Sequence, residues 1–426
     1  MVYMPHPFVI ILGKSVRIAA RLRGGGSALP GLFVEKISPD FIKSTLAQLP
    51  MGVVVISGTN GKTTTAKMVV ALLEAHGLKV FTNRTGSNFS RGVAAALLGE
   101  VTIKGTLDAD IAVLELDEAH AVPFVQAIPP RYSLLLNVMR DQLDRFGEID
   151  ATAKMLEKIA LATTDTVVLN REDTRVLRIK SVLKDQKVEL FGLDDLLVSH
   201  FPSDDDMRSG PVKSTKRPNA HVILKKYSGN KASYQIDGVE FATTLKLNGV
   251  YNVFNSAAAI ALSRAILGAD LKIDTVKKTI ANVTPAFGRG ELLQVGGQPL
   301  ELVLVKNPSG FRLGLKSFSP VGYATMIAIN DNYADGRDMS WLWDVDFESL
   351  ATGGVSQVAG IRAYDMALRL QYDEVKIGHI DKDLSSALRK FIESNSEQPK
   401  RIYCTYTAML SLRRELSKIT KVEVVS

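Results

Sequence analysis

The sequence contains a single cysteine, Cys404, among 426 residues. One cysteine allows neither an intrachain disulfide nor a four-cysteine zinc site, so folding requires no oxidising compartment. The surrounding segment 401–405 has the pattern of a buried strand, which favours a packed thiol. A catalytic thiol is the alternative interpretation.

Long apolar runs and a strong charge of one sign are also missing. The longest early apolar run, 8–12, is too short to span a bilayer, and neither a charged segment before it nor a cleavage site after it indicates a signal peptide. The balance of 52 Lys+Arg against 45 Asp+Glu gives a charge of +7. This mild excess permits contact with phosphates or an anionic membrane surface and does not require nucleic acid. We therefore expect a cytoplasmic protein, with contact at the inner face of the membrane left open.

Apolar runs typical of buried strands alternate with helical stretches, which predicts parallel α/β architecture. The runs lie at 53–56, 79–82, 111–116, 134–137 and 167–170, and a second series lies at 302–305, 325–329, 375–377 and 401–405. The length favours two or three domains. Two segments differ in texture: 7–24 predicts a basic amphipathic helix, and 199–240 predicts an exposed polar insertion with small antiparallel strands. The helix either packs on the protein or contacts a membrane surface.

A phosphate-binding loop follows the first strand. Its residues are Gly58, Thr59, Asn60, Gly61, Lys62, Thr63 and Thr64. The strict Walker pattern is not met because Ile56 stands at the position of its first glycine, but the shorter Gly-Thr-Asn-Gly-Lys-Thr form is present. In such a loop backbone N–H groups bind phosphates, the lysine neutralises them, and the hydroxyl holds Mg²⁺. A glycine-rich turn with a surface lysine is the alternative.

This loop resembles that of the Mur ligases, which form amide bonds through an acyl phosphate. Further segments match the family at 114–120, which contains Glu115, at 249–255, which contains Asn252 and Asn255, and at 287–291, which contains Arg289. The resemblance implies ATP binding by the loop, Asn252, Asn255 and Arg289, with Mg²⁺ held by Thr63 and Glu115. It also implies a P-loop-type parallel-sheet ATPase domain followed by a Rossmann-like C-terminal α/β domain.

The implied domains are a basic helical segment at 1–50 packed on the ATPase domain, a central ATP-binding domain at 51–290, and a C-terminal domain at 291–426. Lys154 and Lys158 lie where many Mur ligases carry a carbamoylated lysine, and spacing does not distinguish them.

Other segments are similar to one branch, the MurT-type subunits of lipid II isoglutaminyl synthase. They lie at 82–88, 137–145, 305–310, 330–338 and 341–344. The resemblance implies amidation of the D-Glu α-carboxyl of lipid II, with ammonia from a GatD-type glutaminase subunit. This sequence contains no recognisable Cys–His–acid segment, which independently favours a partner. In the family an aspartate of the 330–344 motif completes the partner's triad. Asp338 matches best, and Asp335 and Asp344 are alternatives.

The sequence departs from the branch in the middle domain. Many MurT proteins carry a zinc ribbon there, whereas residues 199–222 contain no cysteine, so we expect no zinc. Two other functions remain open. A stand-alone amino-acid-adding Mur ligase or folylpolyglutamate-type ligase is not expected to carry the 330–344 motif. A non-catalytic P-loop scaffold would not need Arg289, Asn252 and Asn255.

Overall fold

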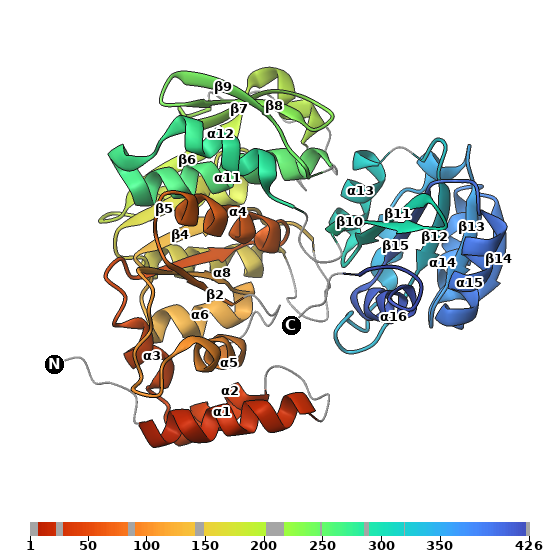
Figure 1. Ribbon diagram of the computed structural model, residues 1–426. Helices are drawn as coiled ribbons and strands as arrows, with labels where there is room; N and C mark the ends of the chain where they lie inside the picture. Colours follow the sequence, from red (N-terminus) through yellow and green to blue (C-terminus); the bar gives the residue numbers. More distant parts are fainter. Residues whose placement is uncertain are drawn as a thin grey trace. The chain divides into compact units, whose positions relative to one another are not determined.

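The computed structural model describes residues 7–22, 29–83, 90–140, 149–201, 217–247, 249–284, 289–318 and 320–422. The chain forms two compact units, and each is described by itself (Figure 1). The first unit comprises Met1–Val138, Asp150–Lys246 and Asn252–Val283. The second comprises Met139–Ile149, Leu247–Tyr251 and Thr284–Ser426.

A sheet of nine strands forms the centre of the first unit, in the order β2-β3-β1-β4-β5-β6-β7-β8-β9. The strands are β1 (Val53–Ser57), β2 (Val80–Thr82), β3 (Ile111–Glu115), β4 (Tyr132–Leu135), β5 (Thr166–Asn170), β6 (Lys187–Leu193), β7 (Val222–Ser228), β8 (Lys231–Ile236) and β9 (Val239–Thr244). In this spatial order, each pair of neighbouring strands from β2 through β1 to β7 is parallel. Strands β1, β3, β4 and β5 are buried along their whole length. Because β1 lies between β3 and β4, the order reverses there, and ligands of such sheets bind beyond the carboxyl ends of the strands at this point.

Helices and helical turns make up the rest of the first unit. They are α1 (Pro7–Leu22), α2 (Leu29–Ile37), α3 (Phe41–Leu46), α4 (Lys62–Ala75), α5 (Ser90–Glu100), α6 (Glu118–Ala127), α8 (Ile149–Ala162), α9 (Thr174–Arg178), η1 (Ile179–Ser181), η2 (Asp195–His200), α11 (Val250–Leu267), η3 (Gly268–Asp270) and α12 (Ile273–Asn282). Two of the starts have a clear local cause. The side chains of Asp117 and Asp173 accept hydrogen bonds from backbone N–H groups in the first turns of α6 and α9.

The region expected as an exposed insertion differs from that expectation. Strands β7 to β9 continue the main sheet, with β7 parallel to β6 and the antiparallel pairs β7–β8 and β8–β9 beyond it. Their alternating sequences bury one face, and Tyr234 is fully buried with its hydroxyl 2.5 Å from Ser256 Oγ. The antiparallel strands were therefore expected correctly, but residues 222–244 belong to the sheet. Residues 202–216 lie outside the described residues.

Among the residues that the structure describes, one helical stretch, Val250–Asp270, is long and apolar enough to cross a membrane by length and composition alone. More than half of its apolar window is buried inside the protein. Its buried alanines and Ile260 and Leu262 pack in the first unit, which is the usual situation of a core helix.

The second unit contains a sheet of six strands in the order β10-β11-β15-β12-β13-β14. The strands are β10 (Arg289–Val295), β11 (Gln298–Leu304), β12 (Ala324–Ala328), β13 (Val355–Ala359), β14 (Ile377–Asp381) and β15 (Lys400–Cys404). The helices and turns are α13 (Pro308–Ser317), η4 (Ser340–Asp344), η5 (Glu348–Leu350), α14 (Ala363–Tyr372), α15 (Leu384–Ser394) and α16 (Tyr406–Leu416). Strands β10 and β11 form an antiparallel hairpin, and every other pair is parallel.

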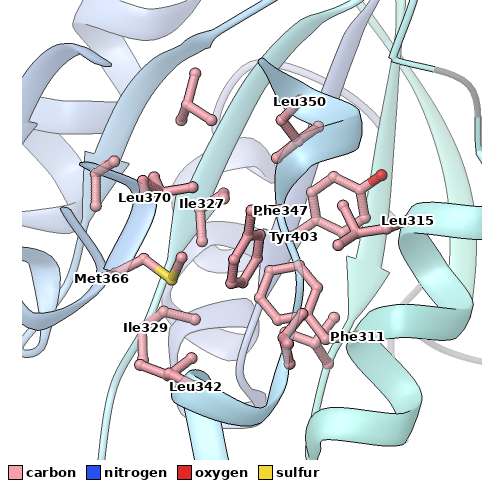
Figure 2. Packing of buried hydrophobic residues seen from close by; sticks show 14 of the residues in the cluster. Phe311, Leu315, Ile327, Ile329, Leu342, Phe347, Leu350, Met366, Leu370 and Tyr403 are labelled. Atoms are coloured by element: carbon pink, nitrogen blue, oxygen red, sulfur yellow. The ribbon is translucent and has the colours of Figure 1, made fainter. Parts of the chain in front are cut away.

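Aromatic rings pack among aliphatic side chains in the core on one face of this second sheet (Figure 2). The Phe311 ring centroid lies 4.9 Å from that of Phe347 and 5.4 Å from that of Tyr403. On the other face Cys404 is fully buried in β15, and burial raises its pKa well above the ordinary value. The buried-strand interpretation of this segment is confirmed, and the thiol is a poor nucleophile in this environment.

Candidate functional site

The phosphate loop joins β1 to α4, and two of its glycines are required by geometry. Gly58 (φ 132°) and Gly61 (φ 91°) adopt backbone conformations that favour glycine. A Cβ atom on Gly58 would lie 2.9 Å from the backbone N of Asn137, and one on Gly61 would lie 2.6 Å from Asn255 Oδ1. The loop is therefore packed tightly between the end of β4 and α11, and Asn255 lies beside it.

Asn137, just beyond β4, fixes the backbone of the loop. Its Nδ2 donates to the carbonyl of Asn60 and its Oδ1 accepts from the Asn60 N–H, both at 2.9 Å. Its own carbonyl accepts from the Thr59 N–H at 3.0 Å. These three hydrogen bonds fix the conformation of the loop backbone at Thr59 and Asn60.

Two side chains from the β5–α9 turn in turn fix the backbone on both sides of Asn137. Asn170 Nδ2 donates to the Leu136 carbonyl at 2.8 Å, and Asp173 Oδ2 accepts from the Val138 N–H at 2.7 Å. Burial raises the pKa of Asp173 to about 6, although hydrogen bonds from backbone N–H groups oppose that rise. Nothing in the sequence distinguishes Asp173 beyond its being a residue type that caps helices.

Thr63 and Glu115 meet at the neighbouring ends of α4 and β3. Thr63 Oγ1 donates to Glu115 Oε1 at 2.7 Å, and Ile56 of β1 lies in register with Glu115. The Asn83 side chain bonds the backbone N–H and carbonyl of Glu115, at 3.0 and 2.8 Å, which fixes its position. A hydroxyl and a carboxylate are oxygen donors of the kind that Mg²⁺ prefers, so this pair fits the expected ion.

Within the described residues no group of three or more His, Cys, Asp or Glu side chains is arranged to hold a metal on its own.

Lys62 does not point into open solvent. Its Nζ donates to the carbonyls of Gly58 at 2.5 Å and Thr59 at 3.3 Å, and it pairs with Glu118 Oε2 at 3.3 Å. Glu118 is buried, so the pair is shielded from water. Glu118 lies in the 114–120 segment that resembles the Mur ligases, but the resemblance implied no role for it. Its position three residues after Glu115 was the available signal.

The other candidate residues of the nucleotide site have fewer described contacts. Thr59 and Thr64 are buried within the loop and α4, and Asn252 is half-buried in the first turn of α11. Arg289 begins β10 in the second unit, and its side chain lies outside what the structure describes, as do residues 285–288 and 141–148. Lys154 and Lys158 are both exposed on α8.

The three candidate acids of the second unit have different surroundings. Asp335 is buried, accepts from the Thr407 N–H at 2.7 Å and from Thr407 Oγ1 at 2.5 Å, and burial raises its pKa. Asp344 pairs with Arg140 at 3.2 Å. Asp338 is partly exposed and accepts from the Ser340 N–H, at the start of η4, at 2.9 Å. Asp335 therefore anchors its loop, whereas the carboxylate of Asp338 is more accessible than that of Asp335.

The sequence matches two protein families. The Mur ligase middle domain family matches residues 56–263, and the MurT ligase C-terminal family matches residues 304–409. The MurT subunit of the glutamine-hydrolysing lipid II isoglutaminyl synthase of Streptococcus pneumoniae is 32% identical, with 96% of each chain covered. The chain belongs to the MurT family. The MurT subunit from Staphylococcus aureus strain COL is 29% identical, with 90% of this chain and 92% of that protein covered.

Solved structures of other ligases have the same fold as this MurT family member. A pseudomurein peptide ligase type C from Methanothermus fervidus has a TM-score of 0.68 at 17% identity, covering 89% of this chain and 80% of that one. The MurF ligase of Thermotoga maritima, solved in complex with ADP, has a TM-score of 0.65 at 17% identity, covering 89% and 84%. The expected Mur-ligase-like α/β fold is thereby confirmed.

Proposed function

We propose that this chain is the ATP-dependent synthetase subunit of a lipid II isoglutaminyl synthase. It converts the α-carboxyl of D-Glu in the peptidoglycan precursor to the amide, in the cytoplasm, with ammonia supplied by a GatD-type glutaminase subunit. One observation carries the proposal. A phosphate loop with the Thr63–Glu115 pair at 2.7 Å lies at the switch point of the sheet, in a chain that aligns over 96% of its length with a MurT subunit.

The chemistry requires activation because a carboxylate is a poor electrophile. Transfer of the γ-phosphoryl group of ATP to the carboxylate oxygen gives an acyl phosphate, and attack by ammonia at its carbonyl carbon releases phosphate and leaves the amide. The loop N–H groups and Lys62 bind the phosphates and balance the charge that develops during transfer. A Mg²⁺ ion held by Thr63 and Glu115 would supply further positive charge between the phosphates.

To bind phosphate, the Lys62 ammonium must give up some of its present contacts within the protein. Its ammonium now pairs with buried Glu118 and two loop carbonyls, and bound phosphate oxygens compete for the same group. Asn255 contacts the loop at Gly61 and, with Asn252, is assigned to the nucleotide. Arg289 is assigned to the phosphates from its motif alone.

The partner is assigned to the second unit. Three large side chains on α14, Tyr364, Leu368 and Tyr372, are spaced four residues apart and therefore share one helix face, and each is about half exposed or more. Trp343, also about half exposed, adds to this surface because its ring centroid lies 5.0 Å from that of Tyr372. A rigid aromatic surface of this kind suits a protein interface. Trp343 belongs to η4, and the Asp338 carboxylate accepts a hydrogen bond from the Ser340 N–H at the start of that turn.

Amidation of lipid II tests the proposal. The chain is purified with its glutaminase partner and supplied with lipid II, ATP and glutamine. We expect Lys62→Ala to abolish amidation, because the cation at the outer phosphates is lost, while Lys79→Ala retains it. Lys79 is a matched control because it pairs with Asp108 at the surface of the same unit. Full activity of the Lys62 variant would contradict the assignment of the phosphate loop.

A further inference from the structure

The N-terminal helix α1 has an unusual charge pattern. Between Pro7 and Leu22 all charged residues are basic, namely Lys14, Arg17 and Arg21. The first acidic residue of the whole chain is Glu35, although the chain contains 45 acids in total. A segment of this kind is attracted to an anionic surface and repelled by a cationic one.

Packing fixes which side of α1 faces the protein. Val9, Ile10 and Gly13 are buried, and the helix packs on α2 and α5. A Cβ atom on Gly13 would lie 2.7 Å from Val34 Cγ2 and 2.8 Å from Leu98 Cδ2. Because this approach is so close, α1 has one orientation on the first unit, and the direction of its remaining side chains follows from it.

The outward side of α1 is apolar. Phe8, Ile11 and Ile18 are 63%, 50% and 61% exposed. With Ser15 they recur at helical spacing and form one stripe, which we call the α1 stripe. Lys14 lies three residues after Ile11 and four before Ile18, so it borders the stripe. At the start of α2, which packs on α1, Leu29 is 54% exposed.

We propose that α1 lies in the plane of an anionic lipid bilayer, with the α1 stripe among the acyl chains and Lys14 at the headgroups. An apolar stripe bordered by basic residues is typical of helices that lie in a membrane interface. A helix of 16 residues is about 24 Å long, and with three basic residues it does not span the hydrocarbon core. The proposal goes beyond the amidation reaction and does not depend on it, but it places the first unit where a lipid-linked substrate resides.

Vesicle sedimentation tests this proposal with the full-length chain and its partner subunit. The probes are phosphatidylcholine vesicles with and without phosphatidylglycerol. We expect sedimentation with the anionic vesicles, weakened by high salt, and little with the neutral ones. The stripe variant Phe8→Ser/Ile11→Ser/Ile18→Ser is expected to bind at least about tenfold more weakly, since three large apolar contacts are lost. Lys14→Glu is expected to bind several-fold more weakly.

A matched control replaces three other exposed apolar residues of the same unit, Ile103→Ser/Leu196→Ser/Val239→Ser. It is expected to bind vesicles like the wild type, and ADP affinity should be unchanged in both triple variants because neither touches the phosphate loop. Absence of binding by the wild type, or equal loss in the control, would overturn the proposal. A wild-type self-association in sedimentation velocity that the stripe variant abolishes would instead assign the stripe to a second copy and would equally overturn it.

Discussion

Asn137 and Asn60 exchange two hydrogen bonds of 2.9 Å each, although 77 positions separate them in the chain. The side-chain amide of one residue thus satisfies both backbone groups of the other, which is a loop residue with no regular secondary structure to satisfy them. The end of β4 therefore determines the shape of the phosphate loop. Asn170 and Asp173 hold the backbone on either side of Asn137, so the support extends to β5.

Removal of the Asn137 side chain should therefore weaken nucleotide binding without removing any group that contacts nucleotide. Asn137→Ala loses two hydrogen bonds of about 1 kcal/mol each, which corresponds to roughly a tenfold to thirtyfold higher Kd for ADP. Isothermal titration calorimetry measures this. Asn282→Ala is the control, since that side chain bonds only its own helix at the Lys278 carbonyl. An unchanged Kd for Asn137→Ala would show that the loop keeps its shape alone.

Asp173 predicts a specific dependence of stability on pH. Its pKa is raised from 3.8 to about 6, so between these values the folded state holds a proton that the unfolded state has lost. The contribution of Asp173 to the free energy of unfolding therefore falls as the pH rises from about 4 to 6, and it is constant above that window. The gap corresponds to roughly 3 kcal/mol as an upper limit.

Urea unfolding of the wild type and Asp173→Asn between pH 4 and 8 measures this contribution, because the variant lacks the titrating group. We expect the difference between the two proteins to change across pH 4 to 6 and to stay flat from 7 to 8. A difference that stays flat across the whole range from pH 4 to 8 would mean that burial does not raise this pKa.

Much of this site could be predicted from the sequence, because consecutive parallel strands end at the same edge of a sheet. The apolar runs before the glycine-rich loop and before Glu115 predicted the two strands, and the resemblance to the Mur ligases implied that Thr63 and Glu115 lie together. Asp173 could not be predicted, since its function depends on a backbone N–H 35 residues away. Strand β14 was expected at 375–377 but spans Ile377–Asp381, because this edge strand exposes His379 and lacks a continuous apolar run. Strand β13 was not expected, because Gln357, which is buried, interrupts its apolar run.

Glu118 provides a test of the partner exchange at Lys62. In the Glu118→Gln variant the phosphates no longer compete with a buried carboxylate for the ammonium, so ADP should bind several-fold more tightly. Asp108→Asn is the matched control, because it removes the charge from a lysine–carboxylate pair at the surface, where screening makes the pair worth little. Weaker binding in Glu118→Gln would indicate that Glu118 supports the loop or the metal directly.

Asp338→Asn separates glutamine hydrolysis from amidation. If Asp338 orients the histidine of the partner, loss of its charge should lower glutamine-driven turnover by up to about 10⁴-fold, as in related triads. Amidation with free ammonia at high pH should persist, because the phosphate loop is unchanged. Asp344→Asn, which loses the pair with Arg140, serves as the control and should retain both activities. Equal loss of both activities in Asp338→Asn would place this residue in the synthetase site.

The identity of the product tests the central claim most directly. The complex of this chain and its glutaminase partner is incubated with lipid II, ATP and glutamine that carries nitrogen-15 in its side-chain amide, and the product is analysed by tandem mass spectrometry. The account predicts that the D-Glu α-carboxyl becomes an amide containing the labelled nitrogen, that ADP forms in equal amount, and that Lys62→Ala yields neither. Addition of an amino acid to the precursor, or ATP turnover with an unchanged precursor, would contradict it.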